Sequence, residues 1–129
     1  MLQEKIVKRE TNKRMSHYPI AVFIDDFDHL VPTDKSILEK IVSIAQRGPR
    51  VGIYTVLTTA RAECNLLSGR LRIEMPTRVA FRTTTTIESR GIIDNPEATL
   101  LSRQGEMFFS HNLKLTKLQT INVMYDNGE

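Results

Sequence analysis

The stretch Pro19-Ile20-Ala21-Val22-Phe23-Ile24-Asp25-Asp26 decides the fold of this chain. Its apolar residues follow one another without polar alternation, a pattern typical of a strand buried on both faces of a parallel sheet. Two carboxylates stand at the point where the strand ends. Because ligands bind beyond the carboxyl ends of the strands in open α/β sheets, we predict a central strand that delivers both carboxylates to a binding site.

A helix and a second strand are predicted to follow. Thr33 is a suitable N-cap for the helix, and Gly48-Pro49 ends it. Between them, apolar residues recur at helical spacing from Ile37 to Ala45. Residues 52–58 form a second apolar run that is predicted to be a buried strand. The order strand, helix, strand indicates a βαβ unit with a right-handed crossover.

The rest of the chain is predicted to alternate between helices and strands. Helices are expected at residues 66–72, 86–93 and 97–101, and strands at 79–82, 106–109 and 113–121. We divide the chain into a charged lead-in at 1–18, a folded domain at 19–124 and a disordered tail at 125–129. The lead-in is interpreted either as a frayed helix or as a basic arm for nucleic acid.

Composition narrows the class of protein. Hydrophobic residues make up 40 % of the 129 residues, which is enough for a core and argues against disorder. The net charge of +3 permits contact with a phosphate backbone without requiring it. The single cysteine, Cys64, excludes an internal disulfide and fits a reducing compartment. No apolar run approaches the ~18 residues of a membrane helix, so we expect a cytoplasmic chain, although a longer parent protein could carry an anchor.

The two carboxylates suit the chemistry of a nucleotide site. At the end of a buried strand, Asp25 can hold Mg²⁺ through a water molecule against nucleotide phosphates. The neighbouring Asp26 can orient the water that attacks a γ-phosphate. An apolar strand that ends in Asp and a second acid is the Walker B pattern. Many α/β strands end in Asp for capping and turns alone, so the residues leave both interpretations open.

Several motifs, in order and spacing, resemble the motor domain of the FtsK/SpoIIIE family of DNA translocases. The family's IDEF, ATQRP, IPTRIAF, IDSRTILD and LLGxGDM correspond to residues 24–27, 58–62, 75–81, 87–94 and 101–107. The resemblance runs from about Pro19 to Phe109. It implies an α/β fold: a partial RecA-like P-loop NTPase core with a mostly parallel sheet and flanking helices, from which the phosphate-loop half is absent.

The resemblance also implies roles for individual residues. Asp25 would position Mg²⁺ through water, and Asp26 would stand in the place of the family's catalytic Glu. Thr58, Thr59 and Arg61, at the end of the second strand, would contact the nucleotide.

Arg78 would act as an arginine finger toward nucleotide held by a neighbouring subunit. An ion pair with Glu74 or Glu88 is the alternative for Arg78.

Three departures from the family pattern weaken the predicted chemistry. Asp26 is one methylene shorter than Glu, which leaves its carboxylate about 1.5 Å short, and a misplacement of that size can cost about 100-fold in rate. Ala60 replaces the family's Gln and cannot hydrogen-bond a phosphate or a water. The chain contains no GxxxxGK followed by Ser or Thr, because it starts after the place of the phosphate loop. We therefore expect weak or absent binding of ATP and Mg²⁺ by the chain alone, and leave open whether it is an enzyme.

The function implied by the resemblance is that of a part of an ATP-driven translocase for double-stranded DNA, a class associated with chromosome segregation. Its expected partners are double-stranded DNA and further copies of the complete protein in a hexamer. One alternative is a degenerate ATPase domain of a type VII secretion-like coupling ATPase that serves as a binding or regulatory module. Another is a standalone interaction protein that completes the site of another subunit with Arg78.

Overall fold

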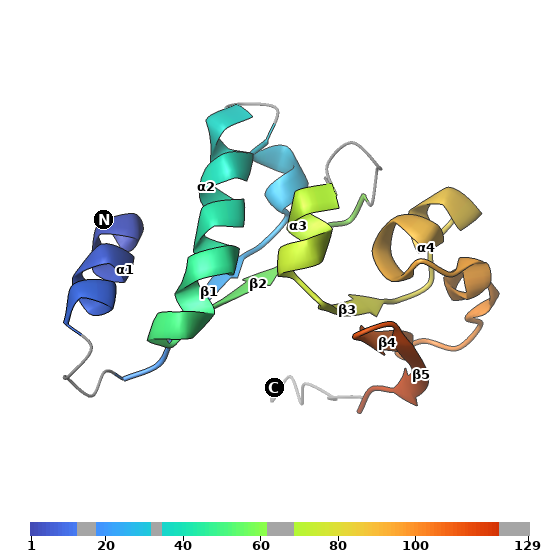
Figure 1. Ribbon diagram of the computed structural model, residues 1–129. Coiled ribbons are helices and arrows are strands. Elements are labelled where there is room, and N and C mark those ends of the chain that lie inside the picture. The colour runs from blue at the N-terminus through green and yellow to red at the C-terminus, as the bar shows by residue number, and fades with distance from the viewer. Residues whose placement is uncertain (13–17, 32–34, 62–68, 122–129) are drawn as a thin grey trace, which may run out of the picture. The chain divides into compact units, whose positions relative to one another are not determined.

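A computed structural model describes residues 1–12, 18–31, 35–61 and 69–121 of the chain (Figure 1). The described residues form two compact units: the first extends to Met75, and the second begins at Pro76. Four predicted features lie outside these ranges: the Thr33 cap, the start of the helix at 66–72, Cys64 and the tail at 125–129.

The first unit is built around two parallel strands. β1 (Ile20–Ile24) pairs with β2 (Ile53–Leu57) in a register that places Ile20 beside Ile53 and Ile24 beside Leu57. The strands are connected through η1 (Phe27–His29), α2 (Lys35–Arg47) and η2 (Gly48–Val51), and the unit also holds α1 (Leu2–Thr11) and α3 (Gly69–Glu74). The parallel βαβ arrangement predicted from the sequence is confirmed.

One face of this strand pair carries the core of the first unit. Phe27 packs with Ile41 and Val42 of α2 and Leu71 of α3, and Ile24 and Leu57 contact the same cluster. In Figure 1, α2 and α3 lie on the same side of β1 and β2. This packing fixes the loop after β1, because Phe27 is only 1 % exposed.

The helix α1 belongs to the packed first unit. Its Ile6 is 1 % exposed and contacts Ile44 and Ile53. Arg9 donates hydrogen bonds to the carbonyls of Val51 and Tyr18, both at 3.0 Å. The lead-in therefore contains a helix that packs onto the elements around β2 through apolar residues and through Arg9.

The opposite face of the strand pair is exposed. Ala21 and Phe23 of β1 alternate with half-buried residues, and their register partners Tyr54 and Val56 alternate with buried and half-buried residues on β2. Phe23 is 74 % exposed, and Tyr54 52 %. The prediction that β1 is buried on both faces is therefore wrong for this chain, because the described helices of the first unit pack against one face only.

The second unit contains a separate antiparallel sheet. Its strands β3 (Thr77–Ala80), β4 (Glu106–His111) and β5 (Lys114–Gln119) lie in the order β3-β4-β5, and α4 (Thr86–Ile93) and η3 (Pro96–Leu100) connect β3 to β4. Ala80, Ile93, Ala98 and Leu101 form its core. The predicted helix at 86–93 is confirmed.

The hairpin between β4 and β5 explains why this sheet departs from the mostly parallel arrangement predicted. Only Asn112 and Leu113 join the two strands, with positive φ angles of 47° and 66°. A two-residue turn with two left-handed residues can join only antiparallel strands, since parallel strands need a crossover of about a dozen residues or more. The sequence pattern gave the positions of these strands but not their direction.

The turn before β4 is held by Glu106. Its Oε2 accepts hydrogen bonds from the backbone N–H groups of Ser102 at 3.0 Å and Arg103 at 3.1 Å, and its Oε1 lies 3.1 Å from Lys117 Nζ. These contacts lower the pKa of Glu106 from 4.5 to about 2. The backbone hydrogen bond from Arg103 has the largest effect, followed by that from Ser102 and then by the side-chain hydrogen bond from Lys117.

None of the helices in the described ranges has both the length and the apolar character needed to cross a membrane.

Candidate functional site

The chain turns sharply where β1 ends. Asp25 and Asp26 are both exposed, and Asp26 adopts the left-handed conformation with φ 45° and ψ 49°. This conformation is disfavoured for most residues other than glycine, but Asp adopts it more readily than most. The turn leads directly into η1, whose buried Phe27 anchors the loop in the core. The sequence thus places two carboxylates on a fixed turn.

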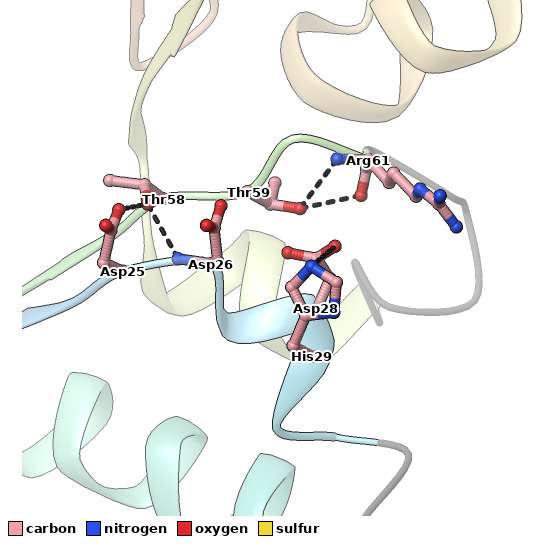
Figure 2. Close-up of polar contacts among 7 residues, drawn as sticks. All are labelled: Asp25, Asp26, Asp28, His29, Thr58, Thr59 and Arg61. Atoms are coloured by element: carbon pink, nitrogen blue, oxygen red, sulfur yellow. Dashed lines mark hydrogen bonds and ion pairs between the residues drawn. The ribbon is translucent and has the colours of Figure 1, made fainter.

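Thr58, the residue after β2, binds this turn through both its backbone and its side chain. Its N–H donates to the carbonyl of Ile24 at 3.0 Å, and its carbonyl accepts from the N–H of Phe27 at 3.0 Å. Its hydroxyl accepts from the N–H of Asp26 at 3.0 Å and donates to the Asp25 carboxylate (Figure 2). The carboxyl ends of the two parallel strands are therefore joined, and Asp25, Asp26 and Thr58 lie together.

Thr59 and Arg61 continue the segment that follows β2. The Thr59 hydroxyl donates to the carbonyl of Arg61 at 2.8 Å and accepts from its N–H at 3.1 Å. Figure 2 shows this short turn above η1, close to Asp26. Both predicted nucleotide-contacting residues thus belong to the same corner of the first unit as the two carboxylates.

A buried carboxylate that the sequence analysis missed lies beside this corner. The side chain of Asp28 is 4 % exposed, and its Oδ2 lies 3.9 Å from Nε2 of the more exposed His29. Its Oδ1 has no hydrogen-bond donor within the described part of the chain. Burial of a carboxylate with few partners is costly. In the sequence, only its position directly after the apolar Phe27 could have indicated that Asp28 is buried, because an acid in a one-turn helix is normally solvated.

The residues fit a Mg²⁺ ion held mainly by phosphates and water. Mg²⁺ usually keeps several waters and takes one or two carboxylates from the protein. Asp25 provides such a carboxylate: it is exposed, at a strand end, and oriented by Thr58. No group of three or more His, Cys, Asp and Glu residues within the described ranges is arranged as a protein-built metal cage. The corner can therefore contribute one oxygen ligand or one water-mediated contact to the ion.

Arg78, the predicted arginine finger, lies on β3 in the second unit. Its Nη2 is 3.0 Å from Oδ2 of Asp94, the residue after α4, and its side chain is 15 % exposed. Asp94, rather than the predicted Glu74 or Glu88, is the carboxylate that pairs with it. Glu88 instead caps the start of α4, where its Oε2 accepts from the N–H groups of Thr84 and Thr85.

Sequence comparison relates most of the chain to DNA translocases. The chain is 37 % identical over 91 residues to the DNA translocase FtsK 2 of Neisseria meningitidis. It is 33 % identical over 99 residues to the DNA translocase FtsK of Haemophilus influenzae. These matches cover 70 % and 76 % of this chain, but only 9 % and 18 % of the two relatives. No protein-family model matches the chain.

Two solved structures share the fold. The cytoplasmic domain of the Thermomonospora curvata type VII secretion ATPase EccC gives a TM-score of 0.83, with 99 % of this chain and 17 % of that chain covered. The pCW3 conjugation coupling protein TcpA, in its monomer form with ATPγS, gives 0.78, with 92 % and 40 % covered. Both are 19 % identical to this chain, a level that establishes the fold alone. The predicted RecA-like α/β architecture is confirmed.

Proposed function

We propose that this chain, which belongs to the FtsK/SpoIIIE family of DNA translocases over about 70 % of its length, is the Mg²⁺-facing part of an ATP-driven motor for double-stranded DNA. The observation that carries the proposal is the corner at which Thr58 joins Asp25 and Asp26 at the ends of two parallel strands. The chain spans 9 % of the first relative and 18 % of the second. Translocation, DNA binding and hexamer formation therefore belong to the proposed complete motor.

Within that motor, the described residues have distinct tasks. Asp25 would hold Mg²⁺ through a water molecule, and the ion would supply positive charge against the phosphates. Asp26 lies next to it on the left-handed turn, in the place from which a family Glu would orient the attacking water. Thr59 and Arg61 form the short turn that lies beside these two carboxylates. The chain alone binds ATP and Mg²⁺ weakly, because the phosphate-binding loop motif is missing from its sequence.

The exposed face of the strand pair supports the idea that the chain functions within a larger core. Phe23, Tyr54 and Val56 place neighbouring large apolar side chains on that face. Exposed apolar patches of this kind usually mark an interface. We assign the phosphate-loop segment of the motor to this face, and we place the assembled motor core in the cytoplasm.

Arg78 keeps its proposed role as a finger toward the nucleotide of a neighbouring subunit, under one condition. Its guanidinium would have to exchange the Asp94 carboxylate for a phosphate oxygen, since it is paired with Asp94 in this structure. Arginine can make that exchange because its fork of donors matches carboxylates and phosphates alike.

A degenerate ATPase module of a type VII secretion-like coupling ATPase is the second candidate. Two features of the sequence favour it: the shortened acid Asp26 and Ala60 at the place of the family's Gln. The fold shared with the type VII secretion ATPase EccC is compatible with both candidates. The two differ in whether the site can be repaired for hydrolysis.

A chimera tests the proposal directly. This chain replaces the matching segment of the Haemophilus influenzae FtsK motor, and ATP hydrolysis is measured with double-stranded DNA. We expect a rate at least about 100-fold below that of the parent, because of the displaced Asp26 carboxylate and Ala60. The double change Asp26→Glu and Ala60→Gln should restore most of the rate, and Asp25→Ala should abolish it again.

Assembly of the chimera into the parent's oligomer is the control for folding. An assembled chimera whose repaired form stays inactive would favour the degenerate module. A repaired form that hydrolyses ATP regardless of Asp25→Ala would refute the proposed metal role.

A further inference from the structure

Thr58 stands where the chain departs from the family pattern. The segment Thr58-Thr59-Ala60-Arg61-Ala62 corresponds to the family's ATQRP, so a hydroxyl replaces an alanine methyl at its first position. An alanine could make the two backbone hydrogen bonds of Thr58, to Ile24 and from Phe27. It could not make the two side-chain hydrogen bonds. The hydroxyl therefore adds contacts at the Mg²⁺-facing corner that the family pattern does not require.

We propose that Thr58 is a positioning residue, which fixes the Asp25 carboxylate and the Asp26 backbone in the arrangement that receives a divalent cation. The inference rests on the proposed function, since it concerns the same corner. It assigns Thr58 a different task from direct contact with the nucleotide, the role that its place after β2 first suggested.

The Thr58 hydroxyl can make only a small number of hydrogen bonds. A threonine hydroxyl has one proton to donate, and that proton is directed at the Asp25 carboxylate. It cannot at the same time donate to a γ-phosphate. Its acceptor side takes the N–H of Asp26 at 3.0 Å. Thr58 thus acts on a cation or a nucleotide through the two aspartates.

The contact with Thr58 restricts the Asp25 carboxylate. An exposed carboxylate on a strand end otherwise samples several rotamers and loses that freedom when it binds an ion. The hydroxyl holds one oxygen of Asp25 and leaves the second oxygen for the cation or its water. Groups that orient a metal ligand in this way typically change metal affinity 10- to 100-fold when they are removed.

Thr58 also holds the backbone of Asp26. Its left-handed turn directs its N–H at the Thr58 hydroxyl, so the same side chain holds the backbone of one carboxylate residue and the side chain of the other. Figure 2 shows Thr58 between the two aspartates. Removal of the hydroxyl should therefore loosen both groups together.

Three variants of the full chain test the inference, and Mn²⁺ alone is the probe. Thr58→Val removes the hydroxyl with little change in shape, and Thr58→Ser restores it. Thr55→Val is the matched control on the same strand, because the Thr55 hydroxyl has no hydrogen-bond partner within the described part of the chain. Two quantities are measured by NMR: the exchange rate of the Asp26 amide, and the Mn²⁺ concentration that half-broadens the signals around Asp25.

In Thr58→Val, we expect the Asp26 amide to exchange roughly tenfold faster, since loss of one hydrogen bond corresponds to about that factor. We expect the half-broadening Mn²⁺ concentration to rise about 10- to 100-fold. Thr58→Ser and Thr55→Val should match the unmodified chain in both measurements.

The two measurements separate failure of this inference from failure of the proposed function. Equal Mn²⁺ response in Thr58→Val and the unmodified chain would overturn the positioning role, whatever the amide exchange shows. Absence of selective broadening around Asp25 in the unmodified chain would overturn the positioning role of Thr58 for an ion held by this chain alone, whereas the metal-facing function would still be decided by Asp25→Ala in the repaired chimera. In that case the exchange of the Asp26 amide would still report whether Thr58 holds the turn.

Discussion

The change Ser89→Ala should destabilise the second unit more than a one-atom deletion would suggest. Ser89 lies on α4 with no measurable exposure. Its hydroxyl donates to the carbonyl of Asn95 and accepts from the N–H of Ala98 at 3.1 Å. Ala98 is equally buried, so water has no access to the amide that would lose its acceptor.

The magnitude follows from the two groups that the hydroxyl satisfies. A buried N–H without an acceptor costs about 1–3 kcal/mol, and a lost donor to a carbonyl adds about 0.5–1.5 kcal/mol. We therefore expect a loss of about 2–4 kcal/mol in the free energy of unfolding of the second unit. With a urea dependence of about 2 kcal/mol per molar, the midpoint should fall by about 1–2 M.

The assay is urea unfolding followed through NMR amide signals of the second unit. Ser102→Ala serves as the control, because Ser102 is exposed and the described structure shows no hydrogen bond from its side chain. That variant should stay within about 0.5 kcal/mol of the unmodified chain. If Ser89→Ala also stayed within that range, the hydroxyl would not bridge α4 to η3 as the structure describes.

Two further predictions concern the close backbone contact at Gly48 and the pH dependence of stability at Glu106. Gly48→Ala should lower the free energy of unfolding of the first unit by about 1–3 kcal/mol, measured by urea unfolding. The reason is that an added Cβ would lie 2.4 Å from the carbonyl oxygen of Ile53 and overpack a buried position. Gly69→Ala is the control and should not destabilise the unit, because an added Cβ there meets nothing within 4 Å. Glu106→Gln should lower stability at neutral pH. The carboxylate has a folded pKa of about 2 against an ordinary 4.5, so its contribution is present above pH 4.5 and is lost between 4.5 and 2. Thermal unfolding of both forms should therefore converge as the pH falls through that window, and a gap that stayed constant would contradict the assigned hydrogen bonds.

The sequence predicted the first unit well because the features that decide it are local. An unbroken apolar run, a helical stripe and a second apolar run leave few arrangements besides a parallel βαβ unit. The placement of Asp25 and Thr58 at one corner follows from that arrangement, because both residues come directly after paired strands. For this reason the candidate site could be predicted from the sequence.

Three features of the structure could not be predicted from the sequence. The direction of β4 and β5 depends on two left-handed residues, Asn112 and Leu113, neither of which is a glycine that would have marked the turn. The partner of Arg78 is Asp94, and only the packing of α4 against β3 brings them together. The uncovered face of β1 escaped prediction too, since an apolar run gives no information on which of its faces has a partner.

The departures at the site do not affect all parts of the proposed chemistry equally. Asp26 and Ala60 alter the groups that would activate water, while Asp25 is retained and gains a hydrogen bond from Thr58. A random loss of function would be expected to affect metal binding and water activation alike, because both depend on the same two strand ends. Under the proposed function, the chain therefore keeps the carboxylate that faces the metal and weakens the groups that would activate water.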